Sequence, residues 1–77
     1  MEKWIRKDLQ LINLRNIREI DCEFIGQDYT NPYEVSVYIG EDKLVIGEFK
    51  KRPDARKLID MIDLFLQCTA NSVLTVR

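Results

Sequence analysis

The stretch from Pro53 to Cys68 constrains the fold most, because its apolar residues repeat at helical spacing. Six side chains follow the i, i+3, i+4, i+7 pattern of one helix face: Ala55, Leu58, Ile59, Ile62, Phe65 and Leu66. At the start of the helix, Pro53 suits the first helical position and Asp54 adds a favourable charge in the first turn. At the end, Asn71 is a residue type that can end a helix in the left-handed conformation. We therefore expect one long C-terminal helix with this face against a core.

Upstream of the helix, short runs alternate between apolar and polar residues. Residues 20–25, 33–39 and 43–49 each show the period of two that is typical of a half-buried strand. Glycine, Asn-Pro and aspartate in the segments between them supply turns. Gly47, inside the last run, indicates either a bulge or a close backbone approach.

The two ends of the chain are more ambiguous. Residues 9–14 predict a short strand, and apolar residues at spacing three in 14–20 fit a single tight helical turn. Trp4 and Ile5 either start another strand or cover a sheet edge. Residues 72–77 form either a short final strand or an apolar tail.

The chain of 77 residues predicts a single domain over residues 1–77, with a core that is marginal at this size. We expect an α+β fold, in which an antiparallel β-meander of three to five strands packs against one long C-terminal helix.

Three features argue against catalysis. The sequence has no histidine, so the usual general base and the commonest metal ligand are missing. Glycine occurs three times, and its positions do not form a phosphate-binding loop. The acidic pairs Asp21/Glu23 and Asp60/Asp63 are explained more simply as solvent-exposed faces than as catalytic or metal-binding groups. We therefore expect no enzymatic activity, no catalytic residue, no metal site and no cofactor.

The two cysteines, Cys22 and Cys68, lie far apart in apolar patterns. They predict two buried free thiols in a reducing compartment, since nothing resembles a disulfide framework. The sequence shows no secretory signal and no apolar run long enough to cross a bilayer. The expected location is the cytoplasm, without membrane contact.

Charge is segregated along the chain. Acidic groups outnumber basic groups eight to one in residues 19–48, whereas both flanking segments carry a net positive charge. Such polarisation steers charged partners, or else the acidic sheet and the basic ends simply complement one another within the molecule.

The predicted helix carries more apolar residues than one core face requires. Met61, Leu64 and Cys68 form a second stripe at i, i+3, i+7 that points away from the core. Either the ends of the chain cover this stripe, through Trp4 and Ile5 or the final strand, or another molecule does. We predict a partner interface formed by Met61, Leu64 and Cys68, with a contribution from Trp4, and a homodimer as its simplest product.

A basic segment precedes and opens the helix. It consists of Lys50, Lys51, Arg52, Arg56 and Lys57. Positive charge beside a helix N-terminus favours anions, so a phosphate or a nucleic-acid backbone could bind there. The simpler interpretation is a solubilising helix start, and the acidic sheet would repel nucleic acid over most of the surface.

The segment LINLRNIREID, a strand pair that ends in IGEF and a helix that begins near Ala55 form a recognisable pattern. It resembles small uncharacterised bacterial and phage-type domains that have an INL..I..I opening, a β-meander and a C-terminal helix. The resemblance covers about residues 11–66, implies a bacterial or phage origin, and implies no particular activity.

The leading functional hypothesis is therefore a non-catalytic protein-interaction module that self-associates. One alternative is an anion- or nucleic-acid-binding protein that uses residues 50–57. The other is a phage-encoded inhibitor that binds a host protein through its acidic sheet, using Glu19, Asp21, Glu23 and Glu34.

Overall fold

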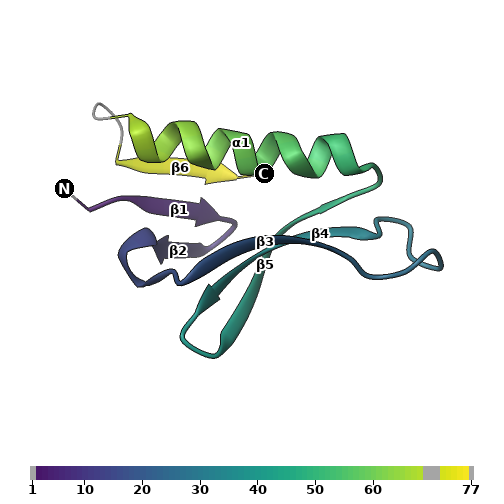
Figure 1. Ribbon diagram of the computed structural model, residues 1–77. Helices are drawn as coiled ribbons and strands as arrows, with labels where there is room; N and C mark the ends of the chain where they lie inside the picture. The colour runs from purple at the N-terminus through teal and green to yellow at the C-terminus, as the bar shows by residue number, and fades with distance from the viewer. Residues whose placement is uncertain (1, 69–71, 77) are drawn as a thin grey trace.

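In the computed structural model, which describes residues 2–68 and 72–76, the alternating runs form six strands in two three-stranded sheets beside one helix (Figure 1). The strands are β1 Trp4–Lys7, β2 Gln10–Asn13, β3 Glu19–Phe24, β4 Tyr33–Ile39, β5 Asp42–Phe49 and β6 Val73–Val76, and the helix is α1 Arg52–Gln67. The predicted α+β class is confirmed. The described strands exceed the predicted three to five because both ends of the chain also become strands.

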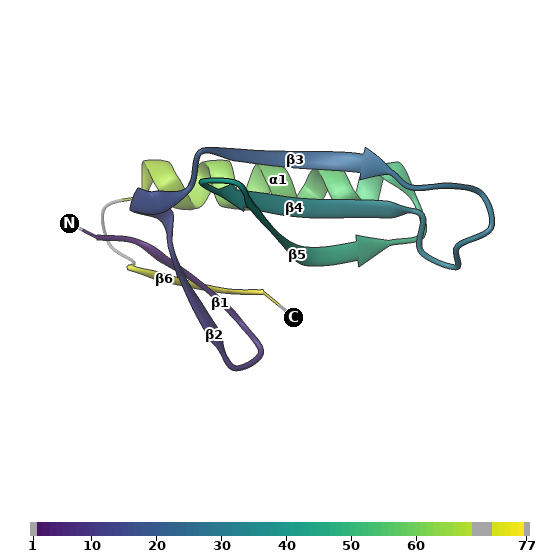
Figure 2. The same cartoon turned by 90° about the horizontal axis from the view of Figure 1, so that it is seen from below.

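The sheet β3-β4-β5, here called the meander sheet, is antiparallel throughout and packs against α1 (Figure 2). Its register shifts between Val35 and Ser36, which lie opposite Gly47 and Val45, so that Ile46 is an extra residue on β5. This is the bulge that Gly47 indicated. The close approach is present as well, because a Cβ atom on Gly47 would lie 2.9 Å from Cδ2 of Leu58.

Replacing Gly47 with alanine should lower the free energy of unfolding by about 1–2 kcal/mol, because the new methyl group overlaps Leu58 of the helix and the ring of Phe49. Urea denaturation followed by circular dichroism measures this. In a Leu58→Ala background the same substitution should cost less, since the overlapping Cδ2 atom is gone. Equal costs in both backgrounds would show that the helix contact is not what requires glycine.

The sheet β2-β1-β6, here called the terminal sheet, joins the two ends of the chain. A two-residue turn connects β1 to β2, and Asp8 there has a φ of 53°, a left-handed conformation that aspartate tolerates. Strand β6 pairs with β1 in parallel, in the register Trp4–Val73 to Lys7–Val76. The short turn predicted within 14–20 is present as a 3₁₀ helix over Leu14–Asn16.

The helix starts one residue earlier than predicted and ends on a cap from Lys3, the residue before β1. Pro53 occupies the second helical position, after Arg52. At the other end, Lys3 Nζ donates a hydrogen bond to the carbonyl of Phe65 (2.6 Å) and another to that of Cys68. A lysine satisfies the last carbonyls and complements the negative end of the helix dipole. The predicted terminator Asn71 lies outside the described residues.

The two sheets and the helix share one core. Its buried residues are Ile5, Ile12, Val35, Val37, Ile46, Ala55, Leu58, Ile62 and Val76. The prediction that Leu66 faces this core is wrong, because its side chain is 48% exposed. Strand β6 lies on the Leu58 side of the helix, where Val76 and Leu58 line the same groove. Leu66 is in the last turn of the helix, where it lines a surface hollow with Lys3 and Leu14, and Ile59 is only half-buried.

The two cysteines are not joined by a disulfide bond, and both are half-buried. None of the described helical segments is both long and apolar enough to span a membrane.

Candidate functional site

The residues predicted to form a partner interface lie on two different elements. Met61 and Leu64 are on α1 with 48% and 68% of their side chains exposed, as expected for a stripe that faces away from the core. Cys68 is half-buried where the helix ends, and its N–H donates to the carbonyls of Leu64 and Phe65. Trp4 belongs to β1 of the terminal sheet.

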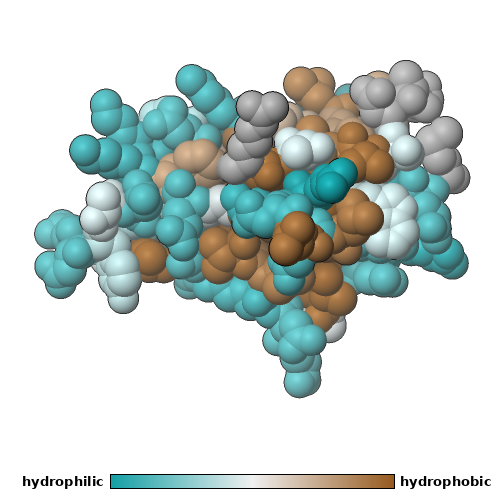
Figure 3. Space-filling model, turned by 180° about the vertical axis from the view of Figure 1, so that it is seen from behind, coloured by the Kyte–Doolittle hydropathy of each residue, from teal (hydrophilic) through white to brown (hydrophobic). Residues whose placement is uncertain are grey.

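The terminal sheet has one face that no helix covers. The pairing places Trp4, Arg6, Leu11, Asn13, Val73 and Thr75 on this outer face, while Ile5 and Ile12 point into the core. Leu11 is 59% exposed and Val73 47% exposed. Figure 3 views the molecule from this side and shows apolar side chains distributed over the sheet and the helix above it.

A groove connects the outer face of the terminal sheet with the helix stripe. Thr75 and Val76 of β6 line it together with Lys57, Leu58 and Met61 of α1, and its volume is about 490 Å³. Strand β6 thus covers one flank of Met61, so the end of the chain packs over part of the stripe, as one of the two alternatives expected. It leaves Leu64 open to solvent.

We call the exposed apolar surface on this side the apolar face, and define it by Trp4, Leu11, Met61, Leu64 and Val73. A second hollow, of about 370 Å³, lies beside Trp4 and Leu11, where Ile39 and Leu44 of the β4–β5 hairpin form its far wall. Sequence reasoning missed Leu11. Its outward direction follows only once Ile12 is known to pair with the buried Ile5.

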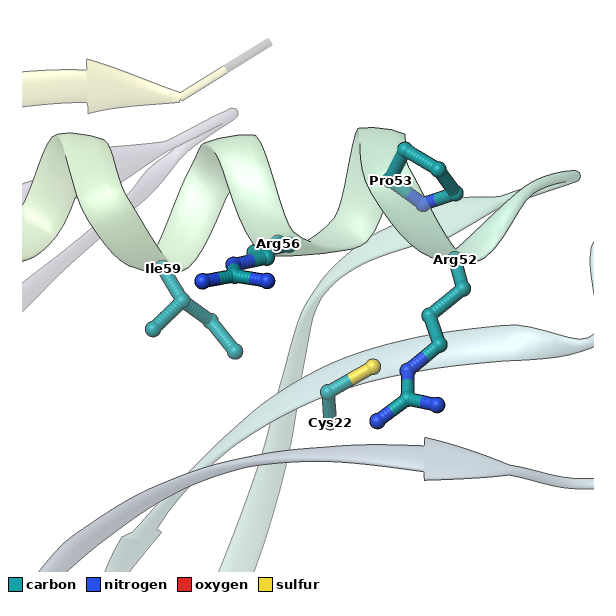
Figure 4. A pocket seen from close by; sticks show the side chains of 5 residues that line it. All are labelled: Cys22, Arg52, Pro53, Arg56 and Ile59. Atoms are coloured by element: carbon teal, nitrogen blue, oxygen red, sulfur yellow. The ribbon is translucent and has the colours of Figure 1, made fainter.

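The five basic residues predicted to bind anions are all exposed, but they do not act as one cluster. Nε of Arg56 lies 4.0 Å from Oδ2 of Asp60, and Nζ of Lys57 lies 4.0 Å from Oδ1 of Asp54. Acidic neighbours on the helix therefore partly neutralise the charges of these two basic residues. Lys57 also borders the groove beside Met61. Arg52 and Arg56 line a separate hollow of about 560 Å³, together with Cys22, Pro53 and Ile59 (Figure 4).

Cys22 lies on β3, below the start of the helix, and Arg52 extends toward it in Figure 4. Burial raises the pKa of the Cys22 thiol, the nearby Asp21 carboxylate raises that pKa further, and Arg52 opposes both effects. A thiol with a raised pKa stays protonated near neutral pH and is a poor nucleophile. The hollow therefore has the charge to attract a small anion, but not a reactive thiolate.

This thiol should react with iodoacetamide at about pH 8 several-fold more slowly in the folded chain than in the urea-unfolded chain, because less thiolate is present. The rate for the folded chain should keep rising at pH values where the unfolded chain has already reached its maximum. A Cys68→Ser variant isolates the signal of Cys22 in mass spectrometry. Equal rates at all pH values would contradict a raised pKa.

The register of β3 with β4 places the four predicted acidic residues Glu19, Asp21, Glu23 and Glu34 on the outer face of the meander sheet. Lys43 lies among them, with Nζ 3.1 Å from a carboxylate oxygen of Glu23 and 3.1 Å from one of Glu34. Hydrogen bonds to Glu34 and then to Glu23 raise the pKa of Lys43.

Within residues 2–68 and 72–76, no group of three or more cysteine and acidic side chains is arranged to hold a metal ion. Comparison with known protein families gave no match, and searches of curated proteins and of solved structures also gave none. The surfaces described above are therefore the basis for a proposed function, and the resemblance to small bacterial and phage domains stays a prediction.

Proposed function

We propose that the chain is a non-catalytic protein-interaction module that self-associates through the apolar face. The observation that carries this proposal is the exposure of large apolar side chains on one side of the molecule, with Leu64 at 68%, Leu11 at 59% and Val73 at 47%. Large exposed apolar side chains that gather on one side of a molecule are typical of interaction sites. Trp4, on the same side, supplies the aromatic anchor that interfaces favour.

A second copy of the chain is the partner that best suits this face. In a two-fold dimer each patch meets a copy of itself, so a patch with charges of one sign repels its own copy. Among the described residues, the outer face of the terminal sheet carries one charged side chain, that of Arg6. By contrast, the outer face of the meander sheet is strongly acidic and the segment 50–57 is mainly basic, so neither is suited to self-pairing.

The size of the chain favours the same conclusion. A domain of 77 residues buries a smaller share of its surface than a larger one, and its core supplies little stability beyond the cost of folding. Burying the apolar face against another copy removes further apolar area from water, and each Å² of it contributes about 25 cal/mol of stabilising free energy. The burial that holds the dimer together would thus also stabilise the fold of each copy.

Sedimentation equilibrium over a range of protein concentrations tests the proposal. We expect a reversible monomer–dimer equilibrium that persists at high salt, because the contact is apolar and salt screens only charged contacts. A chain that remains monomeric at the highest concentration would contradict the proposal. So would a dimer that dissociates when salt is added.

A further inference from the structure

No helix or strand of the described part of the chain packs on the outer face of the meander sheet. It points away from α1, which packs on the opposite face over Val35 and Val37, and Figure 2 looks onto it. The register places on this face Glu19, Asp21, Glu23, Glu34 and Glu48, together with Lys43. Glu48 joins the others because the bulge at Ile46 brings it opposite Glu34.

The charges on this face do not cancel. Lys43 neutralises part of the charge of Glu23 and Glu34, at 3.1 Å from each. In residues 2–68 and 72–76, no ion pair involves Glu19, Asp21 or Glu48. Arg18, whose guanidinium lies 5.7 Å from the ring of Tyr38 opposite Glu19, adds positive charge at one end, but carboxylates still outnumber the cations on this face and attract positive charge.

Ser36 adds a polar group without a hydrogen bond to the same face. By register it lies between Asp21 on β3 and Val45 on β5, with its side chain on their side of the sheet. Only 1% of the residue is exposed, and its hydroxyl has no hydrogen-bond partner in the described structure. A buried polar group without a partner costs free energy, and such groups commonly mark a place where a ligand or partner supplies the missing bond.

We propose that this acidic face docks a lysine- or arginine-rich segment of another protein. Its cationic side chains bind the carboxylates of Glu19, Asp21 and Glu48. One of them displaces Lys43 from Glu34, so that the Ser36 hydroxyl beneath the Lys43 side chain becomes accessible to an N–H group of the segment. The Lys43 contacts show how one cationic side chain already bridges two carboxylates here. Arginine suits the site best, because its guanidinium group donates to a carboxylate in a bidentate manner. This contact leaves the apolar face free, so it is independent of self-association.

Fluorescence anisotropy with a labelled peptide of alternating arginine and glycine, at low salt, tests the proposal. The variant E19Q/D21N/E48Q should bind about tenfold more weakly than the wild type, if each of three exposed ion pairs contributes about twofold. The control D8N/D28N/D63N removes the same charge from positions outside the face, and it should bind within about twofold of wild type. Circular dichroism checks that both variants fold.

Two results would overturn the proposal. Equal losses in the two triple variants would mean that the peptide responds to net charge and not to this face. Absence of peptide binding, together with salt-sensitive oligomers larger than a dimer, would mean that the basic segment 50–57 of a second copy occupies the face.

Ser36→Ala tests the hydroxyl separately. We expect about threefold weaker peptide binding, a typical cost of one lost hydrogen bond, with a thermal unfolding midpoint no lower than that of the wild type. A general loss of fold would lower both binding and the midpoint. Full binding by this variant would contradict the assignment of the Ser36 hydroxyl to the contact.

Discussion

Replacing Ile5 with alanine should cost about 3 kcal/mol of unfolding free energy, which is most of the stability that a domain of this size usually has. Ile5 is completely buried on β1, the middle strand of the terminal sheet. It belongs to the same core as Leu58 and Ile62 of the helix, so its side chain helps to hold the terminal sheet against α1. The alanine leaves a cavity at this junction. Urea denaturation at constant protein concentration measures the loss.

The matched control for Ile5→Ala is Leu9→Ala, at the tip of the same hairpin. Leu9 is fully exposed in the single chain, so its truncation should change the unfolding free energy by less than about 0.5 kcal/mol. A cost below about 1 kcal/mol for Ile5→Ala, or similar costs for both variants, would show that the terminal sheet does not share the core.

The second large effect concerns self-association. Leu11→Asp should weaken the proposed dimer by about a hundredfold, because the two-fold axis places the new charge in the interface twice and each buried charge is costly. Leu11 is 59% exposed in the single chain, so the substitution should leave the monomer folded. Sedimentation equilibrium gives the dissociation constant and circular dichroism gives the fold. Leu64→Asp, on the helix side of the same face, should act in the same direction.

The salt dependence of dimerisation distinguishes an apolar interface from a charged one. The dissociation constant of the wild type should change little with salt, whereas that of a charge-mediated contact rises. A Leu11→Asp protein that dimerises as tightly as the wild type would show that the terminal sheet lies outside the interface.

The sequence predicted the elements whose signal is local. The helix followed from the spacing of Ala55, Leu58 and Ile62, and the meander followed from alternation within each strand. Gly47 marked the bulge, and a Cβ atom at this position would overlap the side chains of Leu58 and Phe49. In each case a short stretch of chain contains the periodicity that determines the structure.

Other features depend on contacts between distant segments, which periodicity does not report. The parallel pairing of β1 with β6 joins residues about 70 positions apart in the register Trp4–Val73, and no pattern within either strand specifies it. Leu66 was also predicted wrongly, because the helix period gives the direction of its side chain and not which distant segments reach the last turn of the helix.

The candidate surfaces also combine features with a local sequence signal and features that depend on contacts between distant segments. Exposure of Met61 and Leu64 followed from the helix period, whereas the place of Leu11 on the same side depends on pairing across the terminal sheet. Glu48 joins the acidic face only through the bulge on β5.

One comparison tests the central claim, that the apolar face is where the chain self-associates, most directly. Met61 and Leu66 lie on the same helix, and each is 48% exposed, but only Met61 belongs to the apolar face. In sedimentation velocity at one protein concentration, we predict dimers for the wild type and for Leu66→Asp, and monomers for Met61→Asp. A monomeric wild type, or equal dissociation of the two variants, would contradict the claim.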